Sequence, residues 1–270
     1  MHHNKMDVRV DQGALPDTLA VERRGSVLVV RLARPAKRNA LNDALVETID
    51  RVFSSVPDDI GAIVLHGEGA HFSAGLDLSE LTERDAVQGL MHSRMWHRAL
   101  DQVQFGKAPV IAALHGAVIG GGLELACAAH IRVAEPSAYY ALPEGQRGIF
   151  VGGGASVRLP RLIGVPLMTD MMMTGRVIKA EEGKPLGFSQ YLVEEGRALQ
   201  TALDLAAKVA GNARMTNYAL MHVLPRIAEI GQDQGLMMES LTAAIAQSAP
   251  EAKARLRDFL EKRGGKVEAK

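Results

Sequence analysis

Residues 115–130 read HGAVIGGGLELACAAH, and they combine three consecutive glycines with one acid, Glu124, in a stretch that is otherwise apolar or small between two histidines. If a helix begins at Gly120–Gly122, its first N–H groups are unpaired and lie at the positive end of the helix dipole. Such groups stabilise an oxygen that gains negative charge. Because a buried ionised group is costly, Glu124 either points outward from a half-buried helix or serves a reaction.

A second glycine turn, FSAGLD at 72–77, follows another apolar run and offers one more backbone N–H near residues 75–76. Two backbone donors from two loops are what an oxyanion hole needs, and glycine permits close approach of a substrate. A second acid, Glu144, lies between Pro143 and a glycine in LPEGQRG. Two carboxylates that face one cavity push each other's pKa values apart, which suits proton transfer at a carbon next to a carbonyl.

Composition argues against several other classes of protein. Lys+Arg and Asp+Glu are 31 each, so no net charge attracts nucleic acid or an anionic membrane. The single cysteine, Cys127, excludes an intramolecular disulfide, the histidines lack zinc-ligand spacing, and Ser73 and Ser156 lack the partners of a serine hydrolase. We expect no metal and no cofactor. The first residues lack a secretory signal and no stretch is long enough to cross a membrane, which predicts a cytoplasmic protein.

The elements that must position these residues repeat a strand, a glycine loop and a helix, without the clean GxGxxG of a dinucleotide fold. Two β runs in 18–34 would join at Arg24-Gly25, and Asn42 or Asn39 would cap a helix. The helices expected from apolar spacing cover 41–52, 83–104 and most of the chain after 198, and the buried strands cover 60–67, 108–116 and 130–135. We therefore expect an α/β core at 18–200, an N-terminal extension at 1–17 and a helical domain at 201–270.

Several longer motifs, in order, resemble the crotonase (enoyl-CoA hydratase/isomerase) family. They are RPAKRNALN, HFSAGLDLSEL, APVIAALHGAVIGGGLELACAAHIRVA, ALPEGQRGIFVGGGASVRLPRLIG and FLEKR, and the similarity covers about residues 20–264. The resemblance implies a crotonase-like β/α spiral core of repeated ββα units. It also implies a C-terminal helical domain that builds trimers, commonly stacked as hexamers.

The resemblance also implies roles for individual residues. The backbone N–H groups of Leu76 and Gly121 would form the oxyanion hole, and Glu124 and Glu144 match the two catalytic glutamates of the family's hydratases. Residues at which the family contacts CoA are Lys37 and Arg38 for its phosphates, and Ala74, Asp77 and Leu78 near its adenine end. A solvated turn is the alternative for Lys37 and Arg38.

The function implied is hydration of the α,β double bond of an enoyl-CoA thioester, as in fatty acid metabolism. An isomerase, a lyase or a thioester hydrolase of the same family is the alternative, and a non-catalytic scaffold or RNA-binding protein is a remote one. Leu76 replaces a smaller residue of short-chain hydratases, and Val151 stands where a proline is usual. These departures change the acyl pocket, which Met91, Met95 and Trp96 either line or support as core residues.

Overall fold

The computed structural model describes residues 15–80 and 82–261, so most of the N-terminal extension expected at 1–17 lies outside the described residues. The described chain up to Ala210 forms one compact unit, and the chain from Gly211 forms a second. The sequence expectation placed the division after residue 200, which lies inside a helix (Ala198–Ala210) that belongs wholly to the first unit.

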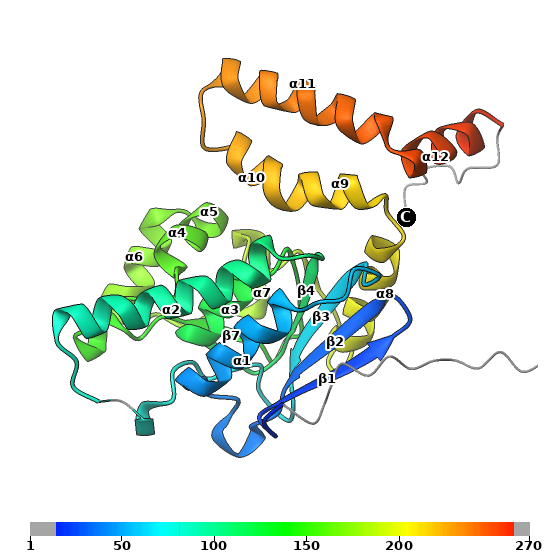
Figure 1. Ribbon diagram of the computed structural model, residues 1–270. Helices are drawn as coiled ribbons and strands as arrows, with labels where there is room; N and C mark the ends of the chain where they lie inside the picture. Colours follow the sequence, from blue (N-terminus) through cyan, green and yellow to red (C-terminus); the bar gives the residue numbers. More distant parts are fainter. Residues whose placement is uncertain (1–14, 81, 262–270) are drawn as a thin grey trace, which may run out of the picture. The chain divides into compact units, whose positions relative to one another are not determined.

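Strands and helices alternate along the first unit (Figure 1). The strands are β1 Leu19–Arg24, β2 Val27–Leu32, β3 Ala62–Gly67, β4 Val110–Leu114, β5 Ala117–Ile119, β6 Ile131–Ala134, β7 Tyr139–Ala141, β8 Ile178–Lys179 and β9 Tyr191–Leu192. The α-helices are α1 Asp43–Ser54, α2 Ala86–Phe105, α3 Gly121–Ala128, α4 Ala155–Arg158, α5 Pro160–Ile163, α6 Val165–Thr174, α7 Ala180–Leu186 and α8 Ala198–Ala210. Short 3-10 helices are η2 Pro35–Lys37, η3 Leu78–Glu80 and η4 Gly145–Arg147.

Within the described residues the strands form two sheets. The larger has six strands in the order β1-β2-β3-β4-β6-β9, and the smaller has three in the order β5-β7-β8. The first pair is antiparallel and turns at Gly25, as the sequence predicts, while β2, β3, β4, β6 and β9 run parallel. Parallel strands need long crossovers, and α1, α2 and α3 lie in these crossovers.

The larger sheet is apolar on both faces, which is typical of parallel strands covered by helices. Alternate strand residues such as Leu28, Val30 and Ile63 pack with α1, α2 and α3 in the main core. The intervening residues, such as Val29 and Val64, pack against α8 on the other face. This burial fixes the strand register, because a shift of one residue would exchange the two faces.

The structure at the start of α1 shows which of the two predicted residues is its N-cap. Asn42 is the N-cap, and its side chain accepts a hydrogen bond from the Leu45 amide at 3.0 Å. Asn39 is fully buried and has another role: its side-chain amide donates to the carbonyls of Glu68 and His71, and its side-chain oxygen accepts from the Arg34 amide. Asn39 thus ties the 34–41 turn to the loop after β3.

The second unit is helical, as expected. Its elements are α9 Arg214–Tyr218, a π-helical turn η5 at Ala219–Val223, α10 Leu224–Ile227, α11 Gln232–Ser248 and α12 Pro250–Leu260. Many of its large apolar side chains are exposed: Tyr218, Leu220, Leu224, Leu236, Met237, Leu241, Ile245, Leu256, Phe259 and Leu260. No helix among the described residues of the chain is long and apolar enough to cross a membrane.

Candidate active site

Three loops meet because the short segments that precede them pair side by side. Ser73 forms a parallel bridge with Val118 of β5, and β5 pairs in parallel with β7. Parallel segments end at the same edge, so the loops that follow them converge there. The first loop carries Leu76, the second leads directly into α3 with Gly121 and Glu124 in its first turn, and the third carries Glu144.

Glu124 lies in the first turn of α3, all of whose residues are buried, and is itself 4% exposed. The outward-facing alternative is therefore wrong. One carboxylate oxygen, Oε1, accepts hydrogen bonds from the backbone amides of Gly153 at 2.8 Å and Ala155 at 3.0 Å. Burial raises the pKa of Glu124, and these amides and the Arg158 charge act in the opposite direction.

Glu144 begins η4, and its Oε2 atom is buried with no hydrogen-bond partner among the described residues. Its pKa is raised to about 7, mainly by burial and also by the charge of Glu124, while a hydrogen bond from its own backbone amide and the charge of Arg147 act in the opposite direction. A carboxyl group with this pKa holds a proton part of the time at neutral pH. The two acids therefore differ, because the amides of Gly153 and Ala155 bind the Glu124 carboxylate, whereas Oε2 of Glu144 is buried without a partner among the described residues.

The amides of Leu76 and Gly121 lie close together at this edge. A Cβ built on Gly121 would be 3.6 Å from the Leu76 nitrogen, and one built on Gly75 would be 3.2 Å from the Gly121 nitrogen. Gly121 is the first residue of α3, so its amide has no acceptor within the helix. The pair can serve one substrate oxygen.

Both acids and both amides line one cavity of about 390 Å³. Trp96 lines it too, whereas Met91 and Met95 lie outside this lining. Sequence reasoning missed several lining residues, namely Arg84, His92, Ser93, Arg147, Ile149 and Phe150. The sequence offered two signals for these residues, the polar character of α2 and the arginine after the Pro-Glu pair. Neither signal indicates in which direction the side chains point.

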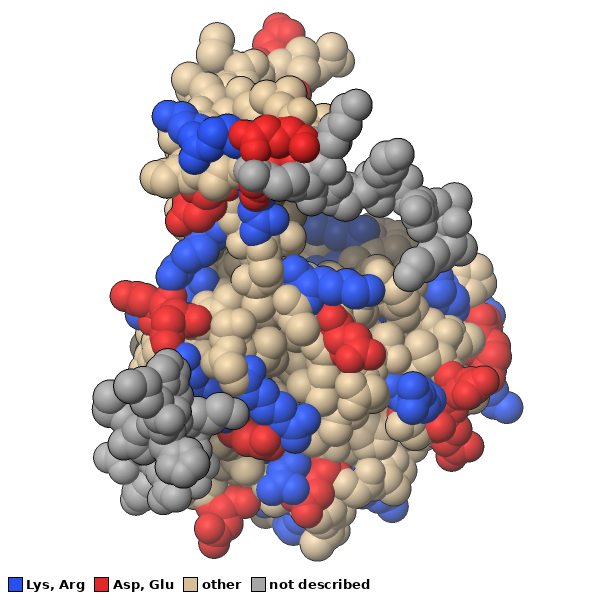
Figure 2. All heavy atoms as spheres, turned by 90° about the vertical axis from the view of Figure 1, so that its right-hand side faces the viewer, with Lys and Arg blue, Asp and Glu red and all other residues tan. Residues whose placement is uncertain are grey.

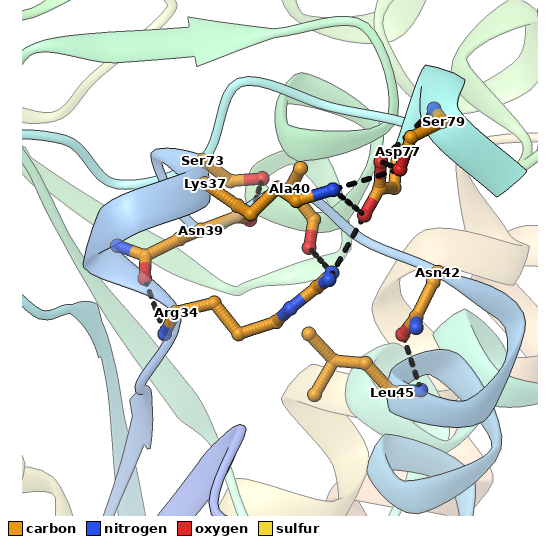
Figure 3. A network of polar contacts seen from close by, with 9 residues as sticks. All are labelled: Arg34, Lys37, Asn39, Ala40, Asn42, Leu45, Ser73, Asp77 and Ser79. Atoms are coloured by element: carbon orange, nitrogen blue, oxygen red, sulfur yellow. Dashed lines mark hydrogen bonds and ion pairs between the residues drawn. The ribbon is translucent and has the colours of Figure 1, made fainter.

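Two of the residues expected near CoA, Lys37 and Asp77, lie close together at the 73–79 turn (Figure 3). Ala74 and Leu78 line the cavity, whereas Asp77 is buried at 4% exposure and accepts from Arg34 at 2.9 Å and from the Ser79 hydroxyl at 2.6 Å. These contacts, the Ser79 hydroxyl first, hold the pKa of Asp77 well below its usual range. The Asp77 carboxylate therefore braces the turn that presents Leu76.

The two basic residues differ in their contacts. Lys37 donates to the Ser79 hydroxyl at 2.7 Å and lies 3.5 Å from Asp77. Arg38 is exposed at the end of η2, with a left-handed backbone, φ 51°. Its carbonyl accepts from the Ala74 amide, so the two turns form one surface. Basic and acidic side chains are mixed over the face in Figure 2, and no cluster of His, Cys, Asp or Glu among the described residues could hold a metal ion.

Comparison with known proteins identifies the family of this chain. The sequence matches the enoyl-CoA hydratase/isomerase family over residues 22–270. It is 31% identical over 250 residues to the short-chain-enoyl-CoA hydratase of Clostridium acetobutylicum, covering 92% of this chain and 96% of that protein. It is 32% identical over 249 residues to the 2,3-dehydroadipyl-CoA hydratase of Escherichia coli, covering 91% and 96%.

A solved structure extends the likeness to the fold. The structure of a predicted enoyl-CoA hydratase from Rhodopseudomonas palustris matches with a TM-score of 0.89 at 63% identity, over 91% of this chain and 95% of that one. Sequence and fold agree over nearly the whole length, and the crotonase resemblance is confirmed. The chain belongs to the enoyl-CoA hydratase/isomerase family of the crotonase superfamily.

Proposed function

We propose that this protein is an enoyl-CoA hydratase that adds water across the α,β double bond of an acyl-CoA thioester. The observation that carries the proposal is the pair of unlike acids, Glu124 and Glu144, on one cavity with the amides of Leu76 and Gly121. An isomerase needs only one well-placed acid, so the pair favours hydration. The hydratase relatives support the same reaction.

In the proposed reaction the thioester oxygen accepts hydrogen bonds from the Leu76 and Gly121 amides. These donors stabilise the negative charge that develops as water adds at the β-carbon. Glu124, which two amides bind as a carboxylate, takes a proton from the water, and Glu144 gives its proton to the α-carbon. The proton that Glu124 has gained then passes to Glu144, so both acids return to their starting forms and the net change is one water added as hydroxyl and hydrogen.

A panel of enoyl-CoA thioesters of different acyl length tests this proposal when hydrated and isomerised products are separated. We expect 3-hydroxyacyl-CoA as the main product from at least one substrate. A shifted double bond without hydration would identify an isomerase, and release of free CoA would identify a thioester hydrolase. Either of these results as the sole activity would contradict the proposal.

The pH dependence follows from the two acids. Because the pKa of Glu144 is about 7 and this group must hold a proton, kcat/KM should fall as the pH rises above about 7. Because Glu124 must be ionised, kcat/KM should also fall at acid pH, beginning above the usual range of a glutamate. Initial rates measured from about pH 4 to about pH 10, a range that covers both limbs of the profile, test this prediction. A flat profile would contradict it.

The basic pair on the 34–41 turn allows a test of CoA binding. If Lys37 and Arg38 contact the CoA phosphates, the double replacement by Ala should weaken CoA binding, and more at low salt than at high salt. Titration calorimetry with free CoA at two salt concentrations measures this. Unchanged affinity at low salt would return the two residues to a solvated turn.

Self-association is the remaining part of the proposal. The exposed apolar side chains of the second unit, together with Met173 at 79% exposure on α6, are typical of surfaces that meet a partner. Met168 and Met171 of the same helix are buried. We expect a homotrimer or a hexamer by light scattering at micromolar concentration, and a monomer would reject this.

A further inference from the structure

Arg158, at the end of α4, is a buried arginine that no part of the proposed reaction uses. It is 8% exposed, and its guanidinium makes three hydrogen bonds with separate partners. It donates to the Gly153 carbonyl at 3.0 Å, to the Gln104 side chain at 2.6 Å and to the Asp101 carboxylate at 2.6 Å. A buried charged side chain is tolerated only where partners of good geometry form hydrogen bonds or ion pairs with it.

The backbone of Gly153 links this guanidinium to Glu124. The carbonyl of Gly153 accepts from Arg158, while its N–H donates to the Glu124 carboxylate. The neighbouring Gly152 carbonyl accepts from the Ser93 hydroxyl at 2.6 Å. The side chain packs directly on the loop, because a Cβ built on Gly154 would lie 2.2 Å from the Arg158 Nη1 atom. The loop that binds Glu124 is therefore braced by α2 and α4.

We propose that Arg158 is a positioning residue that aims the Gly153 and Ala155 amides at Glu124 and keeps this carboxylate in its charged form. The proposal rests on the proposed function, in which Glu124 takes a proton from water. The hydrogen bonds of the guanidinium go to Gly153, Gln104 and Asp101, so it positions the amides through the loop, while its charge acts on Glu124 through space.

The charges around Glu124 come from each neighbouring element. Arg158 of α4 lowers the pKa of Glu124, against the larger effect of burial. The charge of Glu124 in turn raises the pKa of Glu144, which directly precedes η4, and Cys127 shares the helix of Glu124. The uncharged ring of Trp96 in α2 also packs against the loop, since a Cβ on Gly153 would lie 3.1 Å from it. Arg158 thus supplies a positive charge that lowers the pKa of Glu124, against the effect of burial.

The test compares Arg158→Met with Arg132→Met. Arg132 is also buried, at 3% exposure, but it donates to the carbonyls of Ala129 and Phe188, away from the loop. We expect Arg158→Met to lower kcat about a hundredfold, as a misplaced catalytic group does, and to move the acid limb of the kcat/KM profile to higher pH. Arg158→Lys, which keeps the charge but not the fork of donors, should return the limb toward its original position.

The control decides whether the effect is specific. Arg132→Met should lower the unfolding midpoint and leave the acid limb where it is. If Arg158→Met lowers only the unfolding midpoint, with the limb unmoved, the arginine is merely structural and the proposal is overturned.

If Arg158→Met does not fold, Asp101→Asn tests the proposal in its place. The Asp101 side chain is 55% exposed, so the neutral amide can replace it. With its counter-charge removed, Arg158 should favour the Glu124 carboxylate more strongly, and the acid limb should move to lower pH. An unmoved limb, or one at higher pH, would overturn the proposal.

A measurement without turnover separates this proposal from the proposed function. The carboxyl band that Glu124→Gln removes from pH-difference infrared spectra follows the titration of Glu124 directly. It should titrate at higher pH in Arg158→Met and at lower pH in Asp101→Asn. If the unmodified protein hydrates no enoyl-CoA, the proposed function fails, and this band still decides the role of Arg158.

Discussion

We expect Glu124→Gln and Glu144→Gln each to lower kcat for hydration by about a hundredfold or more, the usual range for a general acid or base. Glutamine keeps the shape of each side chain but removes the group that gains and loses a proton. Glu124→Gln retains an oxygen that can accept from the Gly153 and Ala155 amides, so the loop should keep its position. Steady-state kinetics with the best enoyl-CoA of the panel measure the loss.

The double substitution distinguishes joint from separate action. Because groups that act as a unit are not additive, the double variant should be scarcely slower than the slower single one. The oligomer and the affinity for a CoA ester should change little, which light scattering and calorimetry check. A severe loss in only one single variant would indicate an isomerase-like use of one acid. Full hydration by Glu124→Gln would mean that this buried carboxylate is structural.

Gly120→Ala should have the next largest effect, because it combines backbone strain with a collision at the site. Gly120 precedes α3 with φ 51° and ψ −123°, a combination that side chains disfavour. Its added Cβ would lie 2.6 Å from Oε1 of Glu144. We expect the free energy of unfolding to fall by about 1–3 kcal/mol and kcat to fall by about a hundredfold, since Glu144 must move.

Gly25→Ala is the matched control for the strain alone. Gly25 also has a positive φ, 63°, but an added Cβ there meets nothing within 4 Å. This variant should lose about 1–2 kcal/mol of stability, measured by denaturant unfolding, and keep its kcat. If both variants lose stability alone and both keep their activity, the close contact between Gly120 and Glu144 has no role in the reaction.

Much of the first unit could be predicted because its elements have local signals. The apolar spacing of α1, its Asn42 cap and the β1–β2 turn at Gly25 all depend on residues close in the chain. The meeting of Glu124 and Glu144 was implied by resemblance. Its physical cause, the pairing of β5 with β7, is formed by strands too short to show a periodicity.

The supports of the site could not be predicted for the same reason. The partners of Arg158 are Asp101, Gln104 and Gly153, which only the packing of α2 against α4 brings together. Asp77 was expected near CoA, and that role stays a prediction. The structure adds its ion pair with Arg34, a contact with no signal in spacing. Local patterns and the family resemblance thus indicate the candidate acids, while the groups that hold them in place depend on distant segments.

The thiol of Cys127 can be used to measure how often the protein core opens. It is the one cysteine in the sequence, it lies in the same helix as Glu124, and it is 7% exposed. Burial raises its pKa to about 11, so the folded protein holds almost no thiolate, the form that reacts with alkylating reagents. Labelling of this thiol must therefore wait for α3 to open, and its rate measures how often the helix that carries Glu124 leaves the core.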